Sequence, residues 1–349
     1  MKTAYPFTSD TLTTHSLSSG YTTKAGSKVV SSQLDLNIKN GELVALLGPN
    51  GCGKSTLMRT IAGLQDSLNG EVFIAGNNIK GLKARKKATL LSLVLTEKVE
   101  AINLTVGDVV AVGRYPYIGY MGKLDTEDER IIQRALEQCS LEGFRHRLLS
   151  ELSDGEKQRV MIARALAQDT PLMLLDEPTA HLDLINRIDT IRMLYELAKK
   201  TGKAVLVSTH ELDLAMQWAD TIWLMNREGE IHRGVPEDLI LGGAFSEVFD
   251  SKHAFFDMDT GIFKMNRSPV QCIHVKGIEG ARAMWVKRAL ERKGFALGLE
   301  QEANLSIEVE KDIIQIQSKQ GDTKYCSSVS DLLKYLQTQE YWTSIIKDI

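Results

Sequence analysis

The stretch GPNGCGKST, from Gly48 to Thr56, decides the fold of this chain more than any other feature. It directly follows the apolar run ELVALLG, which is typical of a strand, and it opens a segment with helical spacing. A glycine-rich loop in this place lets backbone N–H groups approach phosphate oxygens, and the dipole of the helix favours the anion. We therefore expect a phosphate-binding loop rather than a chance glycine-rich turn.

Two polar residues of this loop suit a bound nucleoside triphosphate and its metal ion. Lys54 is expected to reach the β- and γ-phosphates, and the Ser55 hydroxyl to take one position on Mg²⁺. The other nucleotide-binding candidates in the loop are Gly48, Asn50, Gly51, Gly53 and Thr56. The sequence thus predicts a bound nucleoside triphosphate and Mg²⁺.

Further strand-like apolar runs cover residues 171–177, 203–209 and 221–227, each near a segment with helical spacing. Such strands alternating with helices predict an α/β fold with a parallel sheet buried on both faces. Residues 16–41 alternate more and predict a small antiparallel layer. Residues 84–150 read as mostly helical, which predicts a helical subdomain at about 84–165.

Acidic and imidazole side chains close two of these predicted strands. LLDEP ends in Asp176 and Glu177, and STHE places His210 after another strand. Because open α/β sheets bind ligands at strand ends, Asp176 fits a Mg²⁺ partner and Glu177 the group that polarises the attacking water. His210 could contact the γ-phosphate. The alternatives are a helix cap for the two acids and an ordinary surface position for the histidine.

Composition excludes several other classes. The chain has 349 residues, a net charge of −3 and a pI near 6.2, which argues against a nucleic-acid partner. No apolar run approaches the roughly 20 residues of a membrane span, and the first residues lack the apolar core of a signal peptide. The four cysteines are scattered, as expected in a reducing compartment. We expect a cytoplasmic protein.

The stretch LSDGEKQRV, residues 152–160, has two interpretations. Ser153 followed three positions later by Glu156 is a capping box, which needs no function. Alternatively, Ser153 and the N–H of Gly155 receive a phosphate carried by a second protein molecule. The nine residues alone leave both open.

In order along the chain, GPNGCGKST, LSDGEKQRV, LLDEP, AHLD and STH resemble the motifs of the nucleotide-binding subunit of ABC transporters, over roughly residues 12–260. The resemblance implies a P-loop ABC cassette that forms a head-to-tail homodimer on binding ATP. In it, Ser153, Gly155 and Glu156 would meet the partner's ATP in trans. Asp183 would communicate across the dimer, and Tyr21 would stack on adenine, unless it is an ordinary sheet tyrosine.

The sequence departs from this family's pattern in two places. The signature is usually LSGGQ, so Asp154 and Glu156 add two carboxylates where an anion is expected. No glutamine lies between Gln65 and Gln133, so the usual coupling glutamine is missing; Thr96 or Glu97 stands at that place.

The segment GRYPY after LTVGDVV is similar to one in importers of iron–siderophore complexes, haem and cobalamin, although simple packing is an alternative. The resemblance implies permease subunits, an extracytoplasmic binding protein, and a cassette on the inner face of the cell membrane. The rival function is a soluble ABC ATPase that acts in cofactor assembly, of the Fe–S type, without a permease.

The chain changes character near residue 265, where GIFKMNRSPVQ resembles a linker. We expect a cassette over residues 1–265 and an accessory α+β domain over 266–349. A strand at 272–275 and a helix at 280–293 are predicted, with Trp285, Val286, Ala289 and Leu290 buried. The domain could buttress the dimer or regulate it.

Overall fold

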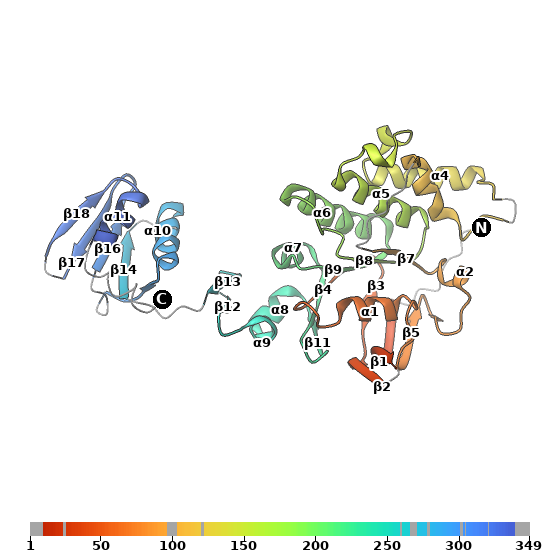
Figure 1. The fold of residues 1–349 in the computed structure, drawn as a ribbon, viewed down its shortest axis with the longest axis horizontal. Coiled ribbons are helices and arrows are strands. Elements are labelled where there is room, and N and C mark those ends of the chain that lie inside the picture. The colour runs from red at the N-terminus through yellow and green to blue at the C-terminus, as the bar shows by residue number, and fades with distance from the viewer. Residues whose placement is uncertain are drawn as a thin grey trace. The chain divides into compact units, whose positions relative to one another are not determined.

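The structure is a computed structural model, and it describes residues 10–23, 26–95, 103–119, 122–258, 260–265, 271–277, 280–300, 303, 305–319 and 321–338. The chain divides into two compact units, drawn in Figure 1. The first comprises residues 1–251 with 255–263, and the second comprises 252–254 with 264–349. We describe each unit by itself.

A six-stranded sheet forms the centre of the first unit, in the order β11-β10-β4-β9-β8-β7. Its strands are β4 (Leu43–Leu47), β7 (Leu91–Val94), β8 (Leu172–Asp176), β9 (Ala204–Ser208), β10 (Thr221–Met225) and β11 (Ile231–Gly234). Strands β7, β8, β9, β4 and β10 pair in parallel, and β11 pairs antiparallel to β10. The predicted α/β fold with a parallel sheet is therefore confirmed, although β7 lies in a region that the sequence pattern assigned to helix.

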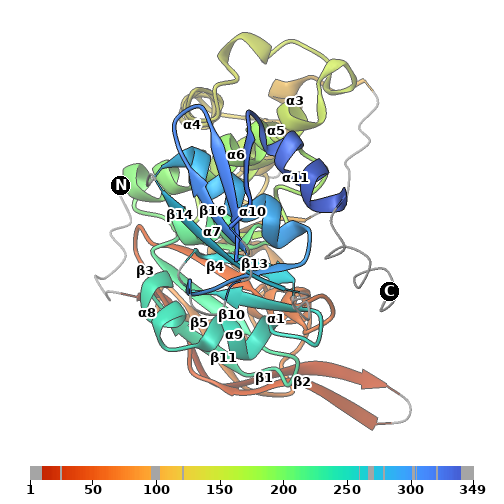
Figure 2. The ribbon, with the colours of Figure 1, turned by 90° about the vertical axis from the view of Figure 1, so that its left-hand side faces the viewer.

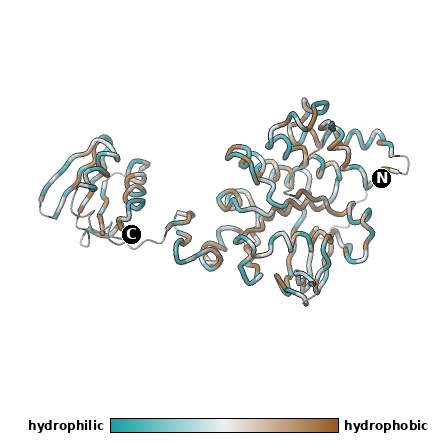
Figure 3. Tube along the Cα trace, in the orientation of Figure 1, coloured by the Kyte–Doolittle hydropathy of each residue, from teal (hydrophilic) through white to brown (hydrophobic). Residues whose placement is uncertain are grey.

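Both faces of this sheet are buried because helices cover one and a second sheet covers the other (Figures 1 and 3). Every residue of β4, β8 and β9 is buried. Within one strand, Leu174 packs on the side of α1, whereas Leu175 packs on the side of the helical layer. This burial on two faces explains the near-continuous apolar runs of the sequence.

An antiparallel sheet packs below the central sheet. Its strands are β1 (Asp10–Thr23), β2 (Gly26–Leu34), β3 (Asn37–Lys39), β5 (Asn69–Ile74) and β6 (Asn77–Asn78). Strands β1 and β2 run side by side, as Figure 2 shows, and β1 also pairs with β5 and β3. The helix α1 (Lys54–Ile61) lies between the two sheets and contributes Leu57, Met58 and Ile61 to the shared core.

The chain between β7 and β8 forms the helices α3 (Val106–Ala111), α4 (Thr126–Gln138) and α5 (Asp154–Ala167), which belong to the helical layer on one face of the sheet. The other α-helices of the first unit are α1, α2 (Ala84–Lys87), α6 (Leu184–Thr201), α7 (Leu212–Trp218), α8 (Pro236–Leu241) and α9 (Ala244–Phe249). Its 3₁₀ turns are Val112–Arg114, Glu142–Phe144 and Leu149–Glu151.

The GRYPY segment contains a buried, hydrogen-bonded arginine next to an exposed tyrosine. Arg114 is 5% exposed, and its guanidinium lies 2.8 Å from Asp128 Oδ1 and donates to Ala167 O at 2.9 Å. It also stacks over the ring of Tyr117, at 4.1 Å from the centroid. Tyr115, by contrast, is 76% exposed. Packing therefore accounts for Arg114 but not for Tyr115.

A hairpin, β12 (Ala254–Asp257) and β13 (Ile262–Met265), follows α9, and its residues 255–263 belong to the first unit. Aromatic rings join the hairpin to the cassette: Phe256 lies 5.1 Å from Phe245, and Phe263 lies 5.6 Å from Phe249. Of these rings, only that of Phe263 lies in the segment GIFKMNRSPVQ, which the sequence predicted to be a linker.

The second unit is a small α+β domain with the strand order β15-β14-β16-β17-β18. Its elements are β14 (Gln271–Gly277), α10 (Ala281–Arg292), β15 (Phe295–Leu297), β16 (Leu305–Val309), β17 (Ile314–Ser318), β18 (Thr323–Cys326) and α11 (Val329–Thr338). Val286, Ala289 and Leu290 are buried as predicted. The prediction that Trp285 is buried was wrong: it is 57% exposed, with Arg288 over its ring at 5.1 Å.

Among the described residues, no helix has the length and apolar composition that crossing a membrane requires.

Candidate functional site

The Gly48–Thr56 loop connects β4 to α1, and two of its glycines are packed closely against other segments. Gly48 has φ of 153°, and a Cβ atom there would lie 2.4 Å from Met225 O. Gly53 has φ of 115°, and its Cβ would lie 2.1 Å from Val30 Cγ1. Only glycine fits these two positions, because both the dihedral angle and the available space exclude a side chain.

Lys54 holds the loop from inside. The residue is buried, and its Nζ donates to Gly48 O at 2.9 Å and to Pro49 O at 3.2 Å. Gly53, the N-cap of α1, supplies no side-chain acceptor for the helix start. The first turn of α1 therefore offers backbone N–H donors and a positive dipole end to an anion.

Asp176 and Ser55 meet at the carboxyl end of β8. Asp176 is 7% exposed, and its Oδ1 accepts from Ser208 Oγ at 2.5 Å and from Ser55 Oγ at 3.4 Å. The sequence pattern did not single out Ser208. Its place as the first residue of STH, at the end of the neighbouring strand β9, was the available signal.

Glu177 and His210 come together from two adjacent strand ends. His210 Nε2 lies 2.5 Å from Glu177 Oε1, and both side chains are partly exposed. Glu177 has φ of 49°, and its N–H donates to Ser208 Oγ at 3.0 Å. A non-glycine residue in the left-handed region is uncommon and is often found at functional sites.

A cavity of about 400 Å³ gathers most of the predicted ATP-site residues. Its lining includes Tyr21, Asn50, Gly51, Gly53, Lys54, Ser55, Thr56, Glu177 and His210, together with Lys28, Arg227 and Glu228, which the sequence pattern did not indicate. Tyr21 is 45% exposed, and its hydroxyl hydrogen-bonds to Thr56 Oγ1. A partly exposed aromatic residue beside a phosphate-binding loop is suited to base stacking.

The local geometry of LSDGEKQRV is a full capping box. The interpretation in which Ser153 and Gly155 meet a phosphate carried by a second protein molecule stays a prediction. Ser153 caps α5: its backbone N–H and its hydroxyl donate to Glu156 Oε2 at 2.7 and 2.8 Å, and Glu156 N donates to Ser153 Oγ at 3.3 Å. These hydrogen bonds lower the pKa of the Glu156 carboxyl below its ordinary value. Neither residue lines the cavity of the phosphate-binding loop.

Asp183 caps α6, because its Oδ1 accepts from Asn186 N at 2.8 Å. The two coupling candidates, Thr96 and Glu97, lie outside the described residues.

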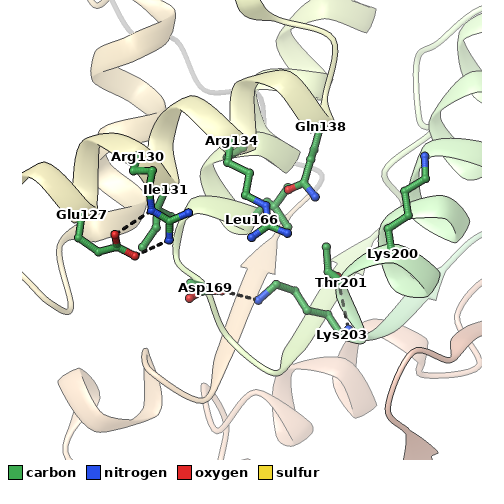
Figure 4. Close-up of a pocket in the computed structure, with 11 residues that line it drawn as sticks. Glu127, Arg130, Ile131, Arg134, Gln138, Leu166, Asp169, Lys200, Thr201 and Lys203 are labelled. Atoms are coloured by element: carbon green, nitrogen blue, oxygen red, sulfur yellow. Dashed lines mark hydrogen bonds and ion pairs between the residues drawn. The ribbon is translucent and has the colours of Figure 1, made fainter. Parts of the chain in front are cut away.

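A second cavity, of about 180 Å³, lies between α4 and the end of α6 and is shown in Figure 4. Three of its cations already have acidic partners: Arg130 Nη2 lies 2.5 Å from Glu127 Oε1, and Lys203 Nζ lies 2.8 Å from Asp169 Oδ1. Lys200 Nζ lies 2.7 Å from Glu196 Oε2. None of the motif residues lines it, so the nucleotide-site candidate remains the cavity at the phosphate-binding loop.

Comparison with known protein families gives two matches. The family model described as ABC transporter matches residues 31–180, and the model described as iron ABC transporter C-terminal domain matches residues 270–337. The second match gives a family to the domain whose role the sequence pattern left open.

Relatives over the cassette are similar along most of their length. An uncharacterized ABC transporter ATP-binding protein of Methanocaldococcus jannaschii is 37% identical over 260 residues, which cover 74% of this chain and 88% of the relative. The petrobactin import ATP-binding protein of Bacillus anthracis is 36% identical, covering 62% of this chain and 79% of the relative. Others are named as iron(3+)-hydroxamate import and cobalamin import ATP-binding proteins, from Bacillus subtilis and Halobacterium salinarum.

Solved structures of the same kind share the fold. A bacterial ABC transporter cassette, solved as a dimer, superimposes with a TM-score of 0.56 at 27% identity, covering 64% of this chain and 98% of that one. The phosphate-binding loop, the acids at the end of β8 and these relatives lead to one conclusion. This chain belongs to the family of ABC transporter ATP-binding proteins, and it is an ATPase.

Proposed function

We propose that this chain hydrolyses ATP to drive import of an iron–siderophore complex, haem or cobalamin through a membrane permease. The observation that carries the ATPase part is the 2.5 Å contact between Glu177 and His210, which line the same cavity as Lys54 and Ser55. A carboxylate that contacts an imidazole beside a phosphate-binding loop is suited to orient a water molecule for attack on the γ-phosphate.

In this proposal the residues of the cavity divide the work by position. Lys54 and the N–H groups of the first turn of α1 neutralise phosphate charge, and Tyr21 stacks on the adenine. Glu177 polarises the attacking water, while His210 holds the Glu177 carboxylate and contacts the γ-phosphate. The proposed contributions are positioning and charge stabilisation, which dominate catalysis of phosphoryl transfer.

The neighbouring side chains of Ser55 and Asp176 suit a bound Mg²⁺ ion. A hydroxyl and a carboxylate 3.4 Å apart are hard oxygen donors, and Mg²⁺ in such sites takes one or two protein ligands with the remainder from phosphates and water. When bound, the ion would neutralise charge on the β- and γ-phosphates. Ser208 would keep the Asp176 carboxylate oriented, since its hydroxyl already donates to Oδ1.

The signature at the start of α5 supports a head-to-tail homodimer that forms on binding ATP. Ser153, Gly155 and Glu156 would lie against the partner's γ-phosphate, with Asp183 communicating between the two sites. The capping box at Ser153 does not compete with this role, because it gives the helix terminus the geometry that presents the Gly155 N–H. For coupling to the permease we keep Thr96 or Glu97 as the candidates.

The cargo class is supported by the C-terminal domain match and by the names of the relatives, which include petrobactin, iron(3+)-hydroxamate and cobalamin import. Tyr115 in GRYPY is a suitable contact for a partner, because its side chain is exposed whereas Arg114 is buried and paired with Asp128. We further propose permease subunits and an extracytoplasmic binding protein as partners, with the cassette on the inner face of the membrane. The relatives lend no support to the alternative of a soluble ATPase in cofactor assembly.

Uptake measurements in the source cells test the proposal. Cells lacking this chain would receive either the unaltered chain or Glu177→Gln, and would then be offered radio-iron bound to a siderophore, haem, or labelled cobalamin. We expect uptake of one of these cargoes to return only with the unaltered chain. Glu196→Gln, a change in an exposed carboxylate on α6, is the matched control and should restore uptake. Normal uptake of all three cargoes in cells without the chain would contradict the proposed cargo class.

A further inference from the structure

The first turn of α6 contacts two places that the proposed function assigns to different ATP molecules. Asn186 and Arg187 lie in this turn and are not among the predicted site residues. Asn186 lies against Gly155 of the signature, and Arg187 pairs with Glu211, the residue after His210. Neighbouring residues on one helical turn thus contact both half-sites of a single protomer.

The Asn186 contact is close and fixed. A Cβ atom built on Gly155 would lie 2.9 Å from both Cγ and Oδ1 of Asn186, nearer than such atoms approach in proteins. On its other side, Asn186 Nδ2 donates to Asp183 Oδ2 at 3.0 Å. The amide is therefore held by Asp183 and packs against the backbone of Gly155.

Arg187 makes the second contact with a forked guanidinium. Its Nε donates to Leu182 O at 2.7 Å, and its Nη1 donates to Glu211 Oε1 at 2.7 Å. Both side chains of this ion pair are about one third exposed. Because His210 precedes Glu211 in the chain, a displacement of the His210 backbone also displaces the partner of Arg187.

We propose that Asn186 and Arg187 are positioning residues that couple the two ATP half-sites of one protomer. This inference rests on the proposed function, in which His210 senses the protomer's own γ-phosphate while Gly155 meets the partner's. A shift at His210 reaches Arg187 through Glu211 and moves the first turn of α6. The same turn carries Asn186, so the shift changes where the Gly155 N–H points. Packed side chains and hydrogen-bond networks of this kind can carry such coupling between sites.

An ordinary structural role is the competing explanation, because residues in a first helical turn often make local hydrogen bonds. The two explanations differ in what they predict. A structural role changes the resistance to unfolding, whereas a coupling role changes turnover and ATP-driven dimerisation without changing the affinity of the single protomer for nucleotide.

A double-mutant cycle separates these explanations. Asn186→Ala, Arg187→Gln and the double variant would be made in the unaltered chain for kinetics, and together with Glu177→Gln for dimerisation by light scattering. We expect each single variant to lower kcat, and to raise the ATP concentration at half-dimerisation, by about 2- to 30-fold. Nucleotide binding by the monomer and the melting temperature should stay unchanged. The double variant should be no worse than the more severe single variant, since both interrupt one set of contacts.

Arg192→Ala is the matched control, since Arg192 lies on the same helix and pairs with Glu196 at 3.6 Å. Multiplying effects in the double variant, or an equal loss in the control, would overturn the inference. Arg187→Glu combined with Glu211→Arg guards against a variant that merely fails to fold: regained turnover relative to Arg187→Glu alone supports the link, and no recovery overturns it. A Glu177→Gln chain that never dimerises with ATP would instead overturn the proposed trans site, and the inference with it.

Discussion

Glu177 Oε1 and His210 Nε2 lie 2.5 Å apart although 33 positions separate them in the chain. The contact exists because β8 and β9 are parallel neighbours, so that their carboxyl ends meet at one edge of the sheet. Two side chains that the sequence placed at separate strand ends therefore form a single pair beside the phosphate-binding loop.

Replacing Glu177 by Gln should abolish turnover and preserve ATP binding. The amide keeps the size of the side chain and its contact with His210 but cannot polarise a water molecule, so we expect kcat to fall at least about 100-fold. Phosphate release measures turnover, and calorimetry measures binding. Glu196→Gln should hydrolyse ATP at the rate of the unaltered chain; steady hydrolysis by the Glu177 variant would show that another group activates the water.

Replacing Tyr21 by Ala should weaken nucleotide binding by loss of base stacking. Stacking of one base on an aromatic ring contributes about 1–3 kcal/mol, so the dissociation constant for ATP should rise about 5- to 160-fold. Tyr21→Phe keeps the ring and loses only the hydrogen bond to Thr56, so it should bind nearly as the unaltered chain does. Equal losses in both variants would indicate that the hydroxyl, not the ring face, matters.

Glu156→Gln should change the pH dependence of stability. The Ser153 hydrogen bonds lower the pKa of Glu156 in the folded chain, so the carboxylate stabilises the fold above the unfolded pKa, and this stabilisation is lost as the pH falls through the lowered folded pKa. A carboxylate near a helix N-terminus contributes about 0.3–1 kcal/mol, and solvent screens this contribution because Glu156 is partly exposed. Urea unfolding of both chains at neutral pH and at decreasing pH measures the difference between their free energies of unfolding, which should disappear in acid. A difference that grows in acid would contradict the assignment of this stabilisation to the Glu156 carboxylate.

Replacing Arg114 by Ala should destabilise the helical layer strongly. The change leaves the Asp128 carboxylate, 9% exposed, without its cation and removes the donor to Ala167 O. Breaking a buried pair on one side costs about 3–5 kcal/mol of unfolding free energy, which denaturant titration measures. Arg130→Ala breaks an exposed pair on the same helix as Asp128 and should leave the unfolding free energy unchanged. A small effect of Arg114→Ala would mean that water molecules replace the lost contacts with Asp128 and Ala167 O.

The sequence predicted those parts of the fold and site that local pattern determines. The strand ends at Asp176 and at His210 follow from apolar runs, and the loop from Gly48 to Thr56 follows from its glycines and the flanking strand and helix. In these cases one continuous segment carries both the residue type and the reason for its place.

Other features depend on contacts between distant segments and were missed. Strand β7 has only four residues and lies among helices, so it joins the sheet through its pairing with β8 rather than through a pattern of its own. The contact between Asn186 and Gly155 depends on how α5 and α6 approach each other. Trp285 was placed in the core beside Val286, yet adjacent residues of a helix point about 100° apart, and only Val286 faces the sheet.

The hydrogen bonds of Lys54 have a thermodynamic consequence for nucleotide exchange. An ammonium group has three N–H donors, and here the carbonyls of Gly48 and Pro49 accept from it. The side chain thereby fixes the curvature of the loop that surrounds it, independently of any phosphate. Conformational entropy of the loop is lost when the chain folds rather than when ATP binds. Successive nucleotides can therefore enter and leave a preorganised loop without ordering it anew in each cycle.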